Sequence, residues 1–107
     1  MYAHFKTALQ RIVAELNKEF RGDVVSVYAF GSRVRGDHSA GSDFDVLVLV
    51  NDRTINLEQG IIDVFVDEEM KSGISFDPVI KTARSFELEK RHNTPFYQNV
   101  AEQGIKI

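Results

Sequence analysis

Two short stretches of almost continuously apolar sequence constrain the fold of this chain most strongly. Residues 24–30 read VVSVYAF and residues 43–50 read DFDVLVLV. Their β-branched and aromatic residues favour strands, and apolar residues on both faces are typical of strands in the interior of a sheet. The sequence therefore predicts two interior strands that other elements must flank.

A helix is predicted before the first strand. Apolar residues recur there at steps of three and four with charged residues between them, which is the pattern of an amphipathic helix. Gly22 is expected to close this helix, because glycine readily adopts the left-handed conformation found at helix ends. The apolar positions are Phe5, Leu9, Ile12, Val13, Leu16 and Phe20.

Residues 54–73, TINLEQGIIDVFVDEEMKSG, carry two overlapping patterns. A helical stripe competes with a strand-like run at IIDVFV, and we predict a helix that ends at Gly73. The charged stretch DEEMK at 67–71 is expected to be a solvated helix end. The predicted inward-facing stripe is Leu57, Ile61, Ile62 and Phe65.

The remaining sequence predicts one more strand and two helices. ISFDPVI at 74–80 favours an edge strand, because Pro78 removes one hydrogen-bond donor from the ladder. RSFELEKR predicts a short helix, and TPFYQNVAEQGIKI opens another, with Thr94 as its N-cap and Pro95 at its first position. The predicted fold is α/β (α+β): a mixed sheet of three to four strands flanked by helices, in one domain spanning residues 1–107.

Composition limits the possible functions. The chain has 107 residues, no cysteine and a formal charge of -3, which argues against thiolate sites and against general nucleic-acid binding through clustered cations. The charged residues within the N-terminal helix argue against a signal peptide or a membrane span. We therefore expect a cytoplasmic protein that does not associate with membranes.

Two carboxylates stand at the start of the second strand. Asp43 and Asp45 are two residues apart and so point to the same face of the strand, with Cα atoms about 6.5 Å apart. Such a pair can bind divalent cations, and Mg²⁺ commonly takes one or two carboxylates together with substrate phosphates. A lone Asp-x-Asp is more often a pair of solvated acids.

The loop before these acids favours the metal interpretation. Gly31 follows a strand and allows close approach of the backbone to an anion, and Ser32 offers its N–H and hydroxyl. Arg33 and Arg35 add guanidinium groups suited to phosphate oxygens. The loop is thus a candidate nucleotide-binding segment.

Gly-Ser, ten residues, then Asp-Phe-Asp resembles the signature of the DNA polymerase β-like nucleotidyltransferase superfamily, and the short chain resembles its minimal, antitoxin-type (HEPN/MNT-like) members. The resemblance implies binding of ATP or another nucleoside triphosphate with two Mg²⁺ ions, and transfer of a nucleotide to an acceptor hydroxyl. It also implies phosphate binding by Gly31 and Ser32 and metal binding by Asp43 and Asp45.

The superfamily's third carboxylate usually lies on a later strand, where it helps to bind metal and acts as general base. Asp77 is the natural candidate for this catalytic and metal-binding role. A register shift of one residue would turn Asp77 to the other face, leaving it an ordinary acid at a strand start. Asp63, in the segment predicted to be helical, is a poorer substitute.

The resemblance implies an enzyme that adenylylates an acceptor, with a helical HEPN-type partner protein or a second copy of the chain holding that acceptor. In that case the chain could be the antitoxin of a toxin–antitoxin pair. A non-catalytic module that binds nucleotide or a partner is the alternative, and it depends on whether Asp77 faces the other acids. A small-molecule resistance nucleotidyltransferase is less favoured, because no acceptor-binding domain is present.

Overall fold

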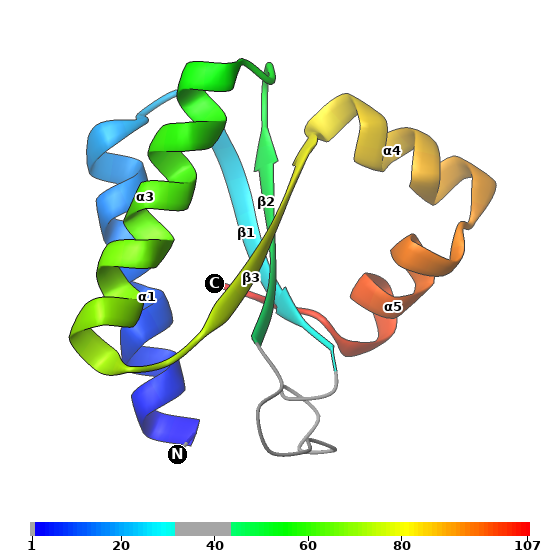
Figure 1. Cartoon of the computed structure of the whole chain (residues 1–107). Coiled ribbons are helices and arrows are strands. Elements are labelled where there is room, and N and C mark those ends of the chain that lie inside the picture. Colours follow the sequence, from blue (N-terminus) through cyan, green and yellow to red (C-terminus); the bar gives the residue numbers. More distant parts are fainter. Residues whose placement is uncertain (1, 32–43) are drawn as a thin grey trace.

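The computed structural model describes residues 2–31 and 44–107, and its centre is a mixed sheet with strand order β3-β2-β1-β4 (Figure 1). The order of elements follows the prediction closely. In sequence they are α1 (Tyr2–Glu19), β1 (Val24–Phe30), β2 (Phe44–Val50), α3 (Ile55–Ser72), β3 (Phe76–Thr82), α4 (Ala83–His92), α5 (Pro95–Gln103) and β4 (Ile105–Lys106).

The two apolar strands occupy the middle of the sheet, as predicted. β1 pairs antiparallel with β2, and β2 pairs parallel with β3. β3 is an edge strand, which confirms the expectation from Pro78. The α3 helix connects the two parallel strands and therefore ends at the end of the sheet where β3 begins.

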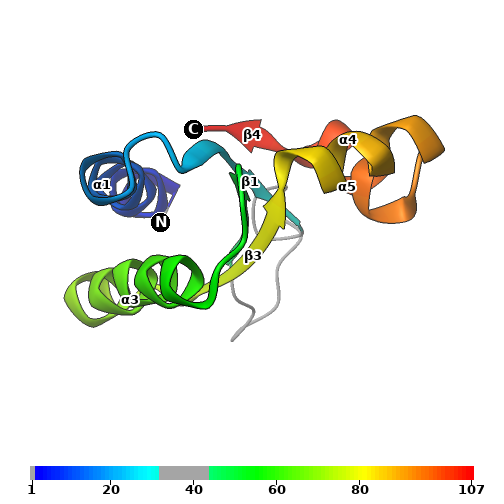
Figure 2. The same cartoon turned by 90° about the horizontal axis from the view of Figure 1, so that it is seen from above.

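The helices form one layer on each face of the sheet. Figure 2 shows α1 and α3 on one side and α4 and α5 on the other. Along β2 the side chains alternate: Val46 and Val48 belong to the core under α1 and α3, whereas Leu47 and Leu49 belong to the core under α4 and α5. This alternation explains why the strand is apolar on both faces.

The predicted start of α5 and the predicted end of α3 are confirmed by their capping residues, whereas α1 ends at Glu19, before Gly22. The Thr94 side chain accepts a hydrogen bond from the Tyr97 N–H at the start of α5, directly before Pro95. Gly73 ends α3 with φ of 75°, and Gly22 follows α1 with φ of 89°. These positive φ values are the conformations that favour glycine.

The C-terminal end differs from the prediction. The sequence predicted no strand after α5, but Ile105 and Lys106 pair with Ala29 and Tyr28 of β1. Gly104 ends α5, and its N–H donates to the Val100 carbonyl. A strand of two residues is too short to show an alternating pattern, which is why sequence reasoning missed it.

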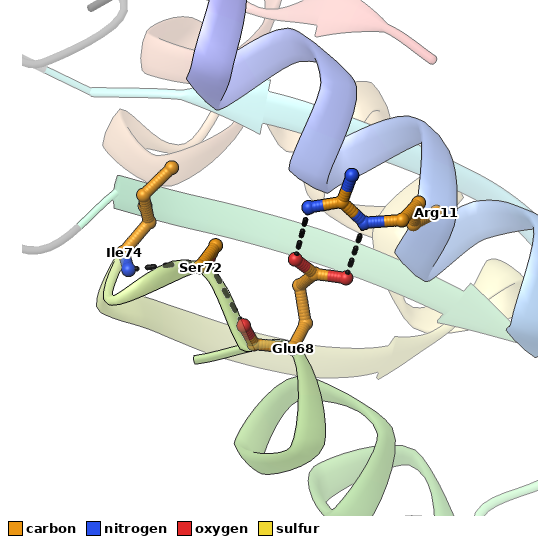
Figure 3. A network of polar contacts seen from close by, with 4 residues as sticks. All are labelled: Arg11, Glu68, Ser72 and Ile74. Carbon is orange, nitrogen blue, oxygen red and sulfur yellow. Dashed lines mark hydrogen bonds and ion pairs between the residues drawn. The ribbon is translucent and has the colours of Figure 1, made fainter. Parts of the chain in front are cut away.

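The expectation that residues 67–71 form a solvated helix end is wrong at Glu68. This side chain is buried and receives two hydrogen bonds from the Arg11 guanidinium, 2.9 Å from Nε to Oε1 and 2.7 Å from Nη2 to Oε2 (Figure 3). These hydrogen bonds outweigh the effect of burial and hold the pKa of Glu68 below its ordinary value. The pair joins α1 to α3.

The predicted inward stripe of α3 is correct for Ile61 and Phe65, which are buried, and wrong for Ile62, which is 39% exposed. None of the helices in the described residues is long and apolar enough to cross a membrane.

Candidate functional site

Two of the predicted carboxylates lie directly beside each other. Asp45 of β2 and Asp77 of β3 are register partners in the parallel ladder, which continues without a shift from Phe44↔Phe76 to Val50↔Thr82. Adjacent strands are about 4.8 Å apart. The structure therefore brings together two acids that are separated by 31 intervening residues in the sequence.

Both acids point to the same face of the sheet. Along β2, Asp45 shares the parity of Leu47, and along β3, Asp77 shares the parity of Val79. Leu47 and Val79 both pack in the core under α4 and α5. The register that the sequence left open thus turns Asp77 toward the side of Asp45, with Asp45 partly exposed and Asp77 exposed.

Gly31 completes the described part of this arrangement. It directly follows β1, whose last residue, Phe30, is the register partner of Asp45. Gly31 has φ of 93°, and a Cβ atom built on it would overlap the Asp45 carboxylate at Oδ2. Backbone and carboxylate are therefore packed together at a position that only glycine fits.

The other predicted site residues lie outside the described part of the chain: Ser32, Arg33, Arg35 and Asp43. Their assigned roles in nucleotide and metal binding stay predictions. Within residues 2–31 and 44–107 there is no group of three His, Cys, Asp or Glu side chains that could hold a metal ion. Asp45 and Asp77 supply two carboxylates there, and carboxylate oxygens are the ligands that Mg²⁺ prefers.

Asp63 lies elsewhere and cannot substitute for Asp77. It is exposed on α3, in the helical layer opposite the face of Asp45, and it accepts a hydrogen bond from Gln59. Its position agrees with the prediction that it was the poorer candidate.

A polar cluster that the sequence did not reveal holds α4 and α5 on the face of the carboxylates. Glu89 of α4 accepts hydrogen bonds from Lys81 of β3 and from the Thr94 hydroxyl, the latter at 2.8 Å. Burial raises the pKa of Glu89, but the two hydrogen bonds and the positive charge of Lys81 together outweigh it and leave the pKa below its ordinary value. Lys81 also lies 4.4 Å from the centroid of the Phe96 ring.

This cluster has a positioning role. Lys81 follows Asp77 by four residues on the same strand and faces the same side of the sheet. Its contacts with α4 and α5 fix both helices over the apolar surface of that face. Only spatial proximity links Lys81, Glu89 and Thr94, and no spacing rule in the sequence would have found them.

Comparison with known proteins agrees with this geometry. Residues 9–105 match the family described as "Nucleotidyltransferase domain". The chain is 30% identical over 97 residues to "Putative protein adenylyltransferase MJ0604" of Methanocaldococcus jannaschii, with 91% of each chain covered.

Solved structures share the fold. A crystal structure of a mutant of the toxin-antitoxin MntA-HpeT superposes with a TM-score of 0.56 at 22% identity, covering 92% of this chain and 70% of that one. Another, "Crystal structure of the toxin-antitoxin with AMP-PNP", gives 0.53 at 22% identity, covering 89% and 68%. With the family match and the paired acids at the sheet end, these findings lead to one assignment. The chain belongs to the nucleotidyltransferase domain family and is a minimal nucleotidyltransferase of the DNA polymerase β-like superfamily.

Proposed function

We propose that this nucleotidyltransferase transfers AMP from ATP to a hydroxyl group on a partner protein. The observation that carries the proposal is the in-register pairing of Asp45 and Asp77 on one face of the sheet. Paired carboxylates suit metal-assisted phosphoryl chemistry. The name of the relative from Methanocaldococcus jannaschii, a protein adenylyltransferase, supports a protein as acceptor.

The residues present fit a divalent metal. Asp45 and Asp77 supply oxygen ligands at adjacent register positions, and Asp43 is proposed as the third ligand. When bound, two Mg²⁺ ions would neutralise charge on the phosphates and activate the attacking oxygen. A Cβ atom at Gly31 would overlap the Asp45 carboxylate, so the site accepts only glycine here, and the absence of a side chain lets the backbone at Gly31 approach the triphosphate.

The two described acids differ in their surroundings, and this difference assigns their roles. Asp45 lies between β1 and β3 and is only partly exposed, whereas Asp77 is exposed and lies on the edge strand. An acceptor hydroxyl approaching from solvent therefore reaches Asp77 more easily. We assign Asp45 to metal binding alone, and Asp77 to metal binding and to proton abstraction as general base.

The reaction that these roles support is a displacement at the α-phosphorus. The acceptor oxygen forms a bond to phosphorus, its proton passes to Asp77, and the bond to the β-phosphate oxygen breaks. Pyrophosphate leaves with the electron pair of that bond. The products are the adenylylated acceptor and pyrophosphate, so no oxidant or reductant is required.

The partner is proposed to be a helical HEPN-type protein, with this chain acting as the antitoxin. The likeness in fold to structures described as toxin–antitoxin complexes, one of them with AMP-PNP, supports this assignment. A self-dimer in which a second copy supplies the acceptor hydroxyl is the alternative arrangement for the same chemistry.

Mass spectrometry tests the proposal. The purified chain is incubated with ATP and Mg²⁺, alone and with the protein encoded by an adjacent gene, and intact masses are recorded. We expect one added AMP on the partner, and none with Asp45→Asn. Retained nucleotide binding without any AMP adduct or pyrophosphate release would favour the non-catalytic binding module instead.

A further inference from the structure

The outer face of α3 carries an apolar stripe that the fold does not use. Seven large apolar residues in the described part of the chain are notably exposed, and four of them lie on this helix. The other three are on separate elements: Val25, Leu88 and Ile105. The α3 stripe consists of Ile55 (85% exposed), Ile62 (39%), Val66 (48%) and Met70 (82%).

Helical spacing places the four residues of the α3 stripe together. Ile62, Val66 and Met70 follow one another at intervals of four, and Ile55 lies seven residues before Ile62. All four share one side of the helix, with the polar Gln59 between Ile55 and Ile62. With a rise of 1.5 Å per residue the stripe is about 22 Å long. The residues that α3 buries in the core, such as Ile61 and Phe65, lie on the opposite side.

This second apolar face explains the overlapping patterns in the sequence. The run IIDVFV resembles a strand because α3 is apolar on two sides, one in the core and one facing solvent. Exposed apolar residues that are scattered need no explanation, but a contiguous stripe with a polar border marks an interaction site. A surface helix that only covers its own core would carry polar residues there.

The border of the α3 stripe is mainly acidic. Asp63 and Asp67 each follow a stripe residue and line one flank together with Lys71, and Glu69 lines the other flank, so three of these four charged residues are acidic. None of these three acids forms an ion pair with another described residue; Asp63 only accepts a hydrogen bond from Gln59. Two copies joined through this face would bring acids together, so charge complementarity favours a partner with basic flanks.

We propose that the α3 stripe is the docking surface for the acceptor protein, which presents a helix with an apolar stripe flanked by Lys and Arg residues. The identity of the partner as the acceptor rests on the proposed function, whereas the docking surface itself follows from the exposed residues of α3 and does not depend on the carboxylate site. The stripe ends at Met70, and α3 ends beside the start of β3, which carries Asp77 (Figure 1). A partner that follows the stripe would thus reach the end of the sheet where Asp45 and Asp77 lie.

Binding of designed peptides to the ¹⁵N-labelled chain tests the proposal. Two helical peptides share the same leucine spacing and differ only in their flanks, which carry Lys and Arg in one and Glu in the other. We expect the basic peptide to shift resonances of α3 and the acidic peptide to leave them unchanged. Val66→Ser combined with Met70→Ser should weaken the basic peptide at least about tenfold. The matched control, Val25→Ser combined with Leu88→Ser, should not.

Three outcomes would overturn the proposal: no shifts with the basic peptide, shifts that map away from α3, or self-association that the Val66→Ser/Met70→Ser variant abolishes, which would make a second copy the occupant. Nucleotide binding and pyrophosphate release are measured in the same variants. Docking variants should still bind nucleotide but lose peptide binding and release less pyrophosphate with the acceptor protein, whereas Asp45→Asn should lose pyrophosphate release and still bind the peptide. Failure of docking and failure of the proposed chemistry are therefore distinguishable.

Discussion

Gly31 and Asp45 are packed so closely that the carboxylate of Asp45 occupies the space a Cβ atom at Gly31 would need. Gly31 also has a positive φ of 93°, so two independent constraints require glycine at this position. This contact joins the end of β1 to the start of β2 at the candidate active site. It is the described feature that most directly links the backbone after β1 to a carboxylate.

Gly31→Ala is predicted to destroy nucleotidyl transfer. The variant should lose about 1–2 kcal/mol of stability from the positive φ alone, and its methyl group should displace the Asp45 carboxylate. Gly22→Ala is the matched control, because Gly22 has φ of 89° and a Cβ atom added there would meet nothing within 4 Å. Both variants should show similar losses of unfolding free energy in urea, and only Gly31→Ala should lose activity. Equal activity in the two variants would contradict the role of the contact.

Asp45→Asn is predicted to weaken divalent metal binding in the presence of nucleotide. The amide retains the size of the side chain but removes the charge that attracts the cation. Electron paramagnetic resonance of Mn²⁺ with a non-hydrolysable ATP analogue would measure the free metal. Asp63→Asn is the control, since Asp63 is exposed on the opposite layer. If both Asp45→Asn and Asp63→Asn bound the metal as tightly as the wild type, this result would count against a metal site at Asp45.

Glu68→Gln is predicted to lower stability at neutral pH and to flatten its dependence on pH in acid. The pKa of Glu68 is below its ordinary value in the folded chain. The contribution of Glu68 to the free energy of unfolding is therefore fully present above the unfolded-state pKa of about 4.3. It is lost as the pH falls through the lower pKa of the folded state. Hydrogen bonds to charged groups contribute roughly 1.5–3 kcal/mol, so the loss near pH 7 should be about 1–2 kcal/mol.

Urea denaturation at a series of pH values measures this effect. Glu69→Gln is the control, because Glu69 is exposed and forms no ion pair with another described residue. If the free energy of unfolding of Glu68→Gln fell with decreasing pH as steeply as that of the wild type, the ion pair with Arg11 would not couple folding to the protonation of Glu68.

Thr94→Ala is predicted to destabilise the chain more than Thr82→Ala. Each threonine caps a helix, and Thr82 accepts from the Ser85 N–H at 3.0 Å. Thr94 additionally donates to Glu89. Loss of a cap costs about 1 kcal/mol, and loss of the extra hydrogen bond should raise the cost for Thr94→Ala to roughly 2 kcal/mol. Midpoints of chemical denaturation measure the difference, and equal midpoints would show that the Glu89 contact adds no stability.

The sequence was sufficient for the elements whose pattern is local. The strands at 24–30 and 44–50 are apolar on both faces, and Thr94 followed by Pro95 is a strong helix start, so each could be placed without tertiary information. The side of the sheet that Asp77 faces could not be predicted from a local pattern. It depends on the register between β2 and β3, and a slip of one residue reverses every side chain.

Residues that act through distant contacts were also beyond the sequence. Glu68 lies in a charged run at a helix end and pairs with Arg11, 57 positions earlier. Its burial follows from how α1 packs on α3, which no local pattern records. Likewise the exposed face of α3 looked like part of a strand, because the sequence does not show which apolar face the core will cover.

The central claim is that Asp77 serves as general base beside Asp45, and single-turnover transfer from α-³²P-labelled ATP tests it most directly. Wild type and Asp77→Asn are compared at saturating nucleotide and acceptor. General-base catalysis contributes about 10²–10⁴-fold, so the account predicts a chemical step slowed by that factor, with nucleotide affinity little changed. A rate in Asp77→Asn equal to that of wild type would contradict the account.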